Sequence, residues 1–193
     1  MNLQHSVLTL LKIISKKQSV NMKSGVVWLT GLSGAGKSTI ARKLSMMLSK
    51  QGCKPIILDG DIMRTILKQH GFDEQSRKEY NRTIARLACY LQLSGHIVIV
   101  ALISPYQKIR DEAREICSNF FEIHVAADLE TCIKRDTKGL YAKALRGEIT
   151  DFTGISAPYE VPLNPELVLD TAAHTIEECI DAITHLLNRN NHE

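Results

Sequence analysis

The chain has 193 residues, 44% of them hydrophobic and 23% charged, which is typical of a single soluble domain with a sizeable core. Its formal net charge of +3 is too small to indicate nucleic-acid binding, although a site for an anionic nucleotide favours a modest local excess of Lys and Arg. The apolar runs fall short of the ~18 residues of a membrane span. We therefore expect neither nucleic acid nor a membrane among its partners.

The cysteines are scattered, lie mostly within apolar segments and never adopt C-x-x-C spacing. This distribution is typical of small core residues in a reducing compartment, and not of a disulfide framework or a metal site. We therefore expect a cytoplasmic protein. The cysteines concerned are Cys53, Cys89, Cys117, Cys132 and Cys179.

Residues 1–24 form an N-terminal segment of a different character. An apolar run precedes Lys16 and Lys17 and no small-residue cleavage site follows, which is the wrong order for a signal peptide. We expect a leader that is helical or loosely ordered, followed by one domain at 25–193.

The first predicted elements enclose a glycine-rich loop. Residues 26–30 are apolar and β-branched and predict a buried strand, and apolar residues recur at helical spacing from Lys37 to about Leu48. A strand, a loop and a helix are the setting that the phosphate-binding pattern G-x-x-x-x-G-K-[ST] requires. The loop that fits this pattern consists of Gly31, Leu32, Ser33, Gly34, Ala35, Gly36, Lys37 and Ser38.

The residue types of this loop explain its chemistry. Glycines let the backbone N–H groups point inward at a phosphate, and the helix that follows adds its positive N-terminal end. Lys37 would reach the β- and γ-phosphates, and the Ser38 hydroxyl would ligate Mg²⁺. The alternative is a glycine-rich turn that binds nothing. We predict a site for a nucleoside triphosphate.

Strand-like and helix-like segments alternate after the loop. The alternation predicts an α/β fold of the P-loop NTPase type, a parallel sheet flanked by helices. The continuously apolar residues 97–103 indicate a strand covered on both faces, and Thr175 and Glu178 form a capping-box pattern. Further strands are expected at 55–58, 120–125 and 167–170, and further helices at about 76–94, at about 107–118 and from 175 onward.

The segment from Lys138 to Pro165 breaks this alternation. Its glycines and prolines stand among several charges without clear periodicity, which is typical of a mobile lid or a binding loop. Kinases of small molecules need a lid, because water in an open site would hydrolyse ATP.

Segments outside the loop distinguish the classes of phosphate-loop protein. A GTPase needs an N-K-x-D segment, which is absent, and the D-x-x-G pattern at Asp151–Gly154 lies in the lid region, so we interpret it as accidental. A motor ATPase carries an acidic strand end, whereas here Ile103–Tyr106 ends the long apolar strand. The short chain and its lid favour a small-molecule kinase.

Charged residues after the second strand are candidates for the acceptor side. Asp59 and Asp61 lie at the carboxyl end of that strand, where ligands of α/β sheets bind. A carboxylate there would accept the proton of a hydroxyl or hold Mg²⁺, and a helix N-cap at Asp61 is the alternative. Arginines from adjacent segments would bind an anionic acceptor, although each alone is equally a solvated surface charge. They are Arg64, Arg77 and Arg82.

Seven short segments share one register with a known family. They are Trp28–Gly34, Leu58–Asp61, Ile103–Tyr106, Lys138–Tyr141, Gly147–Ile149, Phe152–Ile155 and Pro158–Glu160. From Gly25 to Thr171 the chain thereby resembles adenylylsulfate kinases, which use MgATP to phosphorylate the ribose 3′-hydroxyl of adenosine 5′-phosphosulfate (adenylylsulfate). The resemblance implies a parallel sheet with a mobile lid, in agreement with the alternation.

The resemblance also implies residue roles. Asp61 would lie near the acceptor hydroxyl and share Mg²⁺ with Ser38, and Lys37 would act on the transferred phosphate. Ser104 matches a serine described as a phosphoserine intermediate, but in-line transfer needs no covalent relay, so we prefer acceptor binding for it while keeping it as a candidate catalytic residue. The resemblance also implies a set of residues that bind the acceptor. The arginines of this set would hold the phosphosulfate, the lysine would reach phosphates, and the two phenylalanines would sandwich the adenine. The acceptor set is Arg64, Phe72, Arg77, Arg82, Ser104, Lys138 and Phe152.

The acceptor side departs from the family pattern D-R-x-E-N-I-R-R. Residues 76–83 place Tyr80 at the asparagine position and Thr83 at the second arginine. Asn81 is one residue late and, on a helix, would point about 100° away. The sequence is therefore less specific about the acceptor than about the kinase chemistry.

Three hypotheses follow. The leading one is a kinase that makes 3′-phosphoadenylyl sulfate for sulfate assimilation from ATP and adenylylsulfate, with Mg²⁺ as cofactor and a homodimer as the assembly, since dimers are common in the family. The second keeps the fold and changes the acceptor, for example to cytidine diphosphoramidate, which Tyr80 and Thr83 favour. The third is a nucleotide-binding module without turnover, associated with a sulfurylase.

Overall fold

The computed structural model describes residues 24–189, so the predicted leader lies outside the described residues except for Ser24. The elements in chain order are β1 (Gly25–Thr30), α2 (Lys37–Lys50), β2 (Pro55–Asp59), α3 (Gly60–Leu67), α4 (Glu74–Leu93), β3 (Ile97–Ala101), α5 (Gln107–Ile116), β4 (Phe120–Ala126), α6 (Leu129–Arg135), α7 (Leu140–Leu145), β5 (Leu167–Asp170) and α8 (Ile176–Arg189).

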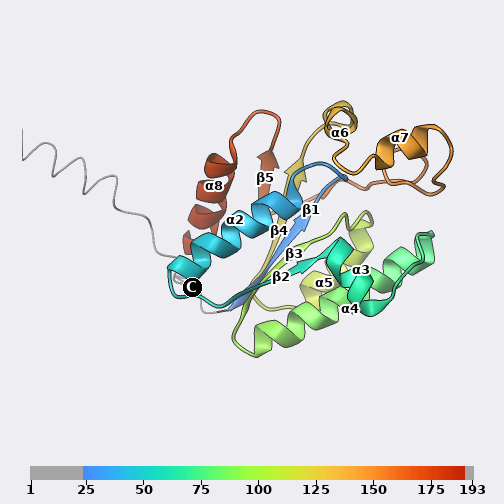
Figure 1. Cartoon of the computed structure of the whole chain (residues 1–193). Helices are drawn as coiled ribbons and strands as arrows, with labels where there is room; N and C mark the ends of the chain where they lie inside the picture. The colour runs from blue at the N-terminus through green and yellow to red at the C-terminus, as the bar shows by residue number, and fades with distance from the viewer. Residues whose placement is uncertain (1–23, 190–193) are drawn as a thin grey trace, which may run out of the picture.

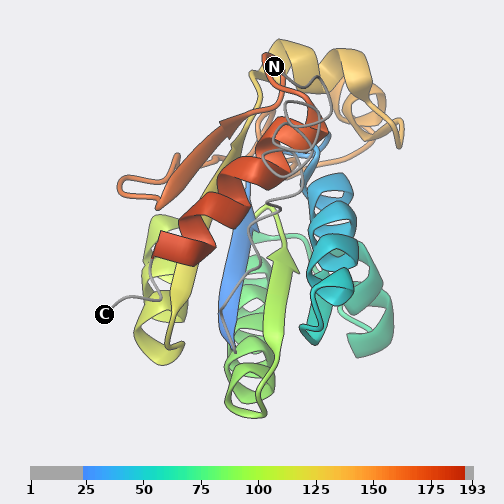
Figure 2. The same ribbon diagram turned by 90° about the vertical axis from the view of Figure 1, so that its left-hand side faces the viewer.

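The described strands form one parallel sheet with the order β2-β3-β1-β4-β5. Helices α2 and α8 cover one face of the sheet, and α4 and α5 cover the other (Figures 1 and 2). Helices α6 and α7 lie beyond the end of the sheet at which β1 stops (Figure 1). The predicted α/β fold, a parallel sheet flanked by helices, is confirmed.

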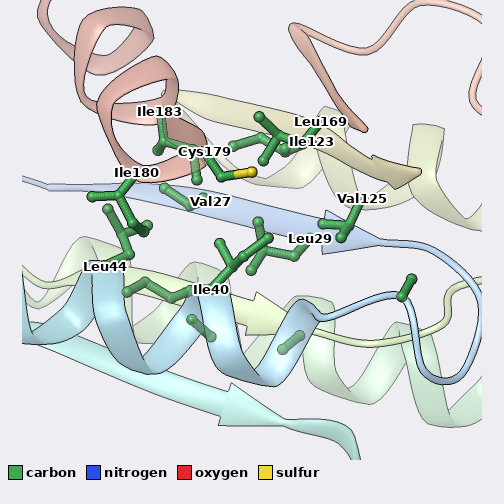
Figure 3. Packing of buried hydrophobic residues seen from close by; sticks show 14 of the residues in the cluster. Val27, Leu29, Ile40, Leu44, Ile123, Val125, Leu169, Cys179, Ile180 and Ile183 are labelled. Carbon is green, nitrogen blue, oxygen red and sulfur yellow. The ribbon is translucent and has the colours of Figure 1, made fainter. Parts of the chain in front are cut away.

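The central strand β1 is buried along its whole length, since helices cover both of its faces. Val27 and Leu29 point into a core that they share with Ile40 of α2 and Ile183 of α8 (Figure 3). The alternate residues of β1, with Trp28 among them, pack into the second core against α4 and α5. Burial on both faces explains why this strand and β3 are uninterrupted apolar runs.

Element boundaries differ from the sequence predictions in a few places. Strand β3 ends at Ala101 and not at Ile103, and α3 and α6 were not predicted. The lid region contains the helix α7, too short to give a clear periodicity. The predicted capping box is confirmed, because Thr175 N donates to Glu178 Oε2 at 2.7 Å and Glu178 N to Thr175 Oγ1 at 3.2 Å.

The five cysteines are free thiols, three of them buried and two half-buried. This agrees with the prediction of small residues in or beside the core. Among residues 24–189, the structure contains no helix with the length and apolar character that crossing a membrane requires.

Candidate active site

A cavity of about 1270 Å³ opens where β1, β2 and β3 end. The phosphate loop forms one wall, the start of α3 and the first half of α4 form another, and residues 101–105 after β3 form its floor. The lid region contributes residues from 148 to 153. Ligands of parallel α/β sheets bind at this end of the strands, so one cavity offers room for both a donor and an acceptor.

The phosphate loop adopts a conformation that depends on glycine at two points. A Cβ atom on Gly31 would lie 2.3 Å from the backbone oxygen of Val125, which is far inside contact distance. Gly36 precedes α2 with φ of 103°, a left-handed conformation that glycine adopts without strain. The motif therefore specifies a backbone shape and not only a set of side chains.

Lys37 is folded back onto the loop. Its Nζ donates to the carbonyl oxygens of Gly31 at 2.9 Å and of Leu32 at 2.7 Å. Burial lowers its pKa from 10.5 to about 8, because charged groups lose solvation in the interior. The ammonium group thus lies within the loop, where a bound phosphate would be its natural counter-charge.

Side chains from three other elements hold the loop by its carbonyl groups. Tyr141 of α7 donates to Ser33 O at 2.9 Å, and Thr171 after β5 donates to Ala35 O at 2.8 Å. Arg135 at the end of α6 donates to the oxygen of Gly34 at 3.3 Å. These contacts connect the loop to the lid region and to the last strand.

Two carboxylates stand beside the loop at the end of β2. Asp59 caps α3, since its Oδ1 accepts from Asp61 N at 3.1 Å, and its Oδ2 accepts from Ser38 Oγ at 2.5 Å. The N-cap is therefore Asp59, and the alternative of a cap at Asp61 is wrong. Asp61 lies in the first turn of α3 and forms an ion pair with Lys138 of the lid. Oxygen ligands of this kind, in this proximity, suit Mg²⁺.

Arg64 lies over two aromatic rings. Its guanidinium carbon is 4.2 Å from the ring centroid of Tyr80 and 4.5 Å from that of Phe72. Its Nη1 donates to the oxygen of Gly71 at 3.0 Å. Partial burial lowers its pKa, but the group remains charged at neutral pH. The structure thus supplies a cation held in place in the wall of the cavity that α3 and α4 form.

Ser104 lies on the cavity floor in a backbone conformation with φ of 45°, which is uncommon for a residue other than glycine. Its hydroxyl donates to Asn81 Oδ1 at 2.7 Å and accepts from Trp28 Nε1 at 3.1 Å. The amide of Asn81 also donates to the oxygen of Arg77 at 2.7 Å. The side chain of Ser104 is therefore oriented by two buried partners.

Arg77 and the two predicted aromatic residues also line the cavity. Arg77 is buried, and its Nη1 donates to Thr153 Oγ1 of the lid at 2.8 Å. Phe72 is 56% exposed, whereas Phe152 is nearly covered and packs edge-on against Tyr141 with the ring centroids 4.9 Å apart. Of the two aromatic residues that line the cavity, one is exposed and the other is packed against a neighbouring ring.

The structure brings most of the predicted site residues together around the cavity, and four of them do not line it. Arg82 does not line the cavity, because it forms ion pairs with Glu112 of α5 and Glu79 of its own helix. Gly31, Leu32 and Ala35 belong to the phosphate loop but do not line the cavity either. The predicted residues that do line it are Ser33, Gly34, Gly36, Lys37, Ser38, Asp61, Arg64, Phe72, Arg77, Ser104, Lys138 and Phe152.

Some residues of this region had no signal in the sequence. Arg110 of α5 is fully buried, and donates to Ser104 O at 2.6 Å and to Glu122 Oε1 at 2.6 Å. In the sequence pattern, Arg110 could not be distinguished from an exposed charged residue of an amphipathic helix. Thr171 and His174 line the donor end of the cavity from the loop after β5. Only the capping box that follows them gave a hint of where this loop ends.

Comparison with known proteins agrees with this geometry. A family model described as adenylylsulphate kinase matches residues 23–170. An adenylyl-sulfate kinase of Bacillus licheniformis is 51% identical over 160 residues, which cover 81% of this chain and 81% of the relative. One of Prochlorococcus marinus is 46% identical over 164 residues, which cover 83% and 82% of the two chains.

Solved structures lead to the same family. The APS kinase of Mycobacterium tuberculosis, solved in complex with AMPPNP and APS, is similar with a TM-score of 0.82 and 40% identity, over 86% of this chain and 98% of that one. A shikimate kinase of Acinetobacter baumannii, 14% identical with a TM-score of 0.53, shares the fold alone. The chain belongs to the adenylylsulphate kinase family.

Proposed function

We propose that this protein transfers the γ-phosphoryl group of ATP to the 3′-hydroxyl of adenylylsulfate, giving 3′-phosphoadenylyl sulfate and ADP. The observation that carries the proposal is the single cavity that joins the phosphate loop to Asp61, the arginines and the two phenylalanines. A relative with 40% identity over nearly its whole length binds an ATP analogue and APS together, which supports two nucleotides in such a cavity.

The donor phosphates would bind on the loop. Its backbone N–H groups and the N-terminus of α2 attract the anionic group, and Lys37 would exchange its two carbonyl partners for phosphate oxygens. A phosphate beside Lys37 would also counter the burial that lowers the lysine pKa. Arg135, Thr171 and His174 line the cavity beyond the loop, and we assign the donor base to that end.

Mg²⁺ would be held by Ser38 and Asp61, with Asp59 as the residue that orients the Ser38 hydroxyl. The Ser38–Asp59 hydrogen bond of 2.5 Å and the Asp61 N–H bond to Asp59 bring these three oxygen-bearing side chains to one corner. When bound, the ion would neutralise charge on the transferred phosphoryl group.

The acceptor would bind against α3 and α4. Arg64 and Arg77 are the cations of this wall and would hold the phosphosulfate, and Phe72 and Phe152 are placed to contact the adenine. Asp61 would accept the proton of the 3′-hydroxyl as the hydroxyl oxygen attacks the phosphorus. The ion pair with Lys138 places the lid lysine beside the same carboxylate, where it would also meet the transferred phosphate.

Ser104 would act in acceptor binding and not as a phosphorylated intermediate. The residue is 2% exposed, and its hydroxyl is hydrogen-bonded to Asn81 and Trp28. In-line transfer between two bound nucleotides needs positioning and charge neutralisation, which the other residues supply.

We further propose that the protein is a cytoplasmic homodimer. A hexameric APS kinase from Thiobacillus denitrificans, 32% identical with a TM-score of 0.66, supports assembly among its relatives. Multi-angle light scattering of the purified chain tests the dimer, and a measured mass equal to that of a single chain, 21.6 kDa, would contradict it.

An acceptor screen tests the proposed reaction. The purified protein is incubated with MgATP and either adenylylsulfate or cytidine diphosphoramidate, and ADP formation is measured. We expect turnover with adenylylsulfate. Absence of turnover with adenylylsulfate at saturating ATP would refute the proposal. Turnover with cytidine diphosphoramidate alone would establish the second acceptor, which Tyr80 and Thr83 favour in the sequence.

A further inference from the structure

We propose that Tyr80 is a positioning residue that fixes two parts of the acceptor wall at once. Its ring holds the guanidinium of Arg64, and its hydroxyl holds the turn that carries Asp61. The inference rests on the proposed function, since it assigns Arg64 to the acceptor and Asp61 to the reacting hydroxyl. It gives a role to the tyrosine that stands where the family pattern has asparagine.

The ring of Tyr80 contacts the charged group of Arg64. The guanidinium carbon lies 4.2 Å from the ring centroid, which is within the range of a favourable cation–π interaction. Tyr80 itself is 2% exposed, so its ring is a fixed platform, whereas Phe72, the other ring under Arg64, is largely exposed. Tyr80 is therefore the buried one of the two rings that contact Arg64.

The hydroxyl of Tyr80 reaches the turn between the two aspartates. It donates to the carbonyl oxygen of Gly60 at 2.7 Å, and Gly60 stands between the helix cap Asp59 and Asp61. Burial raises the pKa of Tyr80 to about 12, so the hydroxyl keeps its proton at neutral pH. Gly60 also packs against the residues at the end of β3, because a Cβ atom on it would lie 2.9 Å from Leu102 Cδ2 and 3.4 Å from the oxygen of Ala101.

These two contacts affect different steps. Arg64 acts on the anionic group of the acceptor, so loss of its support weakens acceptor binding and raises KM. Asp61 acts on the reacting hydroxyl, so a looser turn misplaces the carboxylate and lowers kcat. A tyrosine that served only as core packing would lower stability when replaced and would not separate the two kinetic constants.

The test compares two substitutions of Tyr80 with matched controls. Tyr80→Phe keeps the ring and removes the hydroxyl, and Tyr80→Leu removes both. Tyr90→Phe and Tyr90→Leu are the controls, because Tyr90 lies on the same helix and is 66% exposed. Steady-state kinetics with adenylylsulfate and MgATP and thermal unfolding are measured for all four variants and the wild type.

We expect Tyr80→Phe to lower kcat about 5- to 10-fold through the lost hydrogen bond, with KM for adenylylsulfate within about twofold of the wild type. We expect Tyr80→Leu to raise that KM about 5- to 30-fold as well, through the lost cation–π contact. Wild-type kinetics in Tyr80→Phe would overturn the inference. So would two Tyr80 variants in which the fold-changes of kcat and of KM stand in the same proportion. A wild-type protein inactive on adenylylsulfate would instead refute the proposed function.

A spectroscopic measurement tests the ring contact independently of the folding of Tyr80→Leu. The arginine Nε–H signals are recorded by NMR, and the signal of Arg64 is identified by its loss in Arg64→Lys. Phe72 also lies under Arg64, so the signal is recorded in Phe72→Leu, which removes that ring and leaves Tyr80. We expect an upfield ring-current shift in the wild type and in Phe72→Leu. An unshifted signal in Phe72→Leu would exclude the contact with Tyr80 in solution.

Discussion

The donor and acceptor halves of the cavity are held together by different kinds of contact. In the donor half, side chains bind backbone carbonyls of the phosphate loop, as Lys37, Tyr141 and Thr171 do. In the acceptor half, side chains bind the backbone as well, but they also bind one another, as in the Ser104–Asn81 hydrogen bond and the Arg64–Tyr80 contact. Few substitutions that alter the backbone of the phosphate loop would preserve these contacts. In the acceptor half, a substituted side chain can form new contacts with its neighbours.

The difference explains where this chain departs from its family pattern. The phosphate loop is intact, and the changes at Tyr80 and Asn81 lie in the acceptor half. Asn81 binds Ser104 and the backbone of Arg77, and Tyr80 binds Arg64 and Gly60, so the side chains of both changed residues are held by specific partners. The acceptor half is altered but ordered.

The largest effect should come from Asp61, to which we assign both Mg²⁺ binding and the acceptor hydroxyl. Asp61→Asn keeps the shape and removes the base, so we expect kcat to fall about 10²- to 10⁴-fold. Binding of AMPPNP, measured by calorimetry, should stay within a few-fold. Asp181→Asn is the control, an exposed aspartate of α8. Unchanged ADP release in Asp61→Asn would contradict the assigned mechanism.

The next effect tests whether the donor half depends on backbone shape. Gly31→Ala places a Cβ against the Val125 carbonyl, and we expect it to lower the free energy of unfolding by about 3 kcal/mol. Gly52→Ala is the control, because Gly52 is also left-handed but meets nothing within 4 Å, and should cost only about 1 kcal/mol. Denaturant unfolding measures both. Equal losses would show that steric contact at Gly31 is unimportant.

A pH titration probes the charge of the donor half. The pKa of Lys37 is lowered to about 8, so its positive charge is lost as the pH rises through that value. Since AMPPNP binding uses the charged form, we expect the affinity to fall roughly tenfold from pH 7 to pH 9. Lys37→Met should bind more weakly and show no such dependence. The same pH dependence in Lys37→Met would assign it to another group.

The smallest effect is expected at Arg82. Its ion pairs with Glu112 and Glu79 keep it outside the cavity, so we expect Arg82→Met to change KM for adenylylsulfate less than about twofold. Arg77→Met is the comparison, because Arg77 lines the cavity and should raise KM much more. A comparable increase in Arg82→Met would place Arg82 in the acceptor site.

Much of the fold was predictable from the sequence, because burial on both faces of the sheet makes its strands visible as apolar runs. β1 and β3 were recognised in this way, and the glycine loop located the helix that follows β1. The short helices α3, α6 and α7 were missed, since fewer than three turns give too little periodicity. Their positions depend on packing and on caps such as Asp59.

The site was predictable to the extent that its residues form contiguous motifs. The loop, Asp61 and the arginines were found, and most of them line one cavity. Arg82 could not be separated from Arg64 and Arg77 in the sequence, because only the fold places Glu112 beside it. The role of Arg110 beneath Ser104 depends on burial, which the pattern of a single helix does not reveal.

The register between β1 and β3 fixes where the two neighbouring segments of the cavity leave the sheet. These strands pair from Gly25 with Ile97 to Leu29 with Ala101, and beyond them Gly31 N donates to Ile103 O at 3.4 Å. The phosphate loop leaves one strand, and the segment with Ser104 leaves its neighbour. Because neighbouring strands are about 4.8 Å apart, the sheet holds the starts of these two segments at a fixed spacing. We therefore expect substitutions in the side chains of α3 and α4 to change which acceptor binds without changing this spacing.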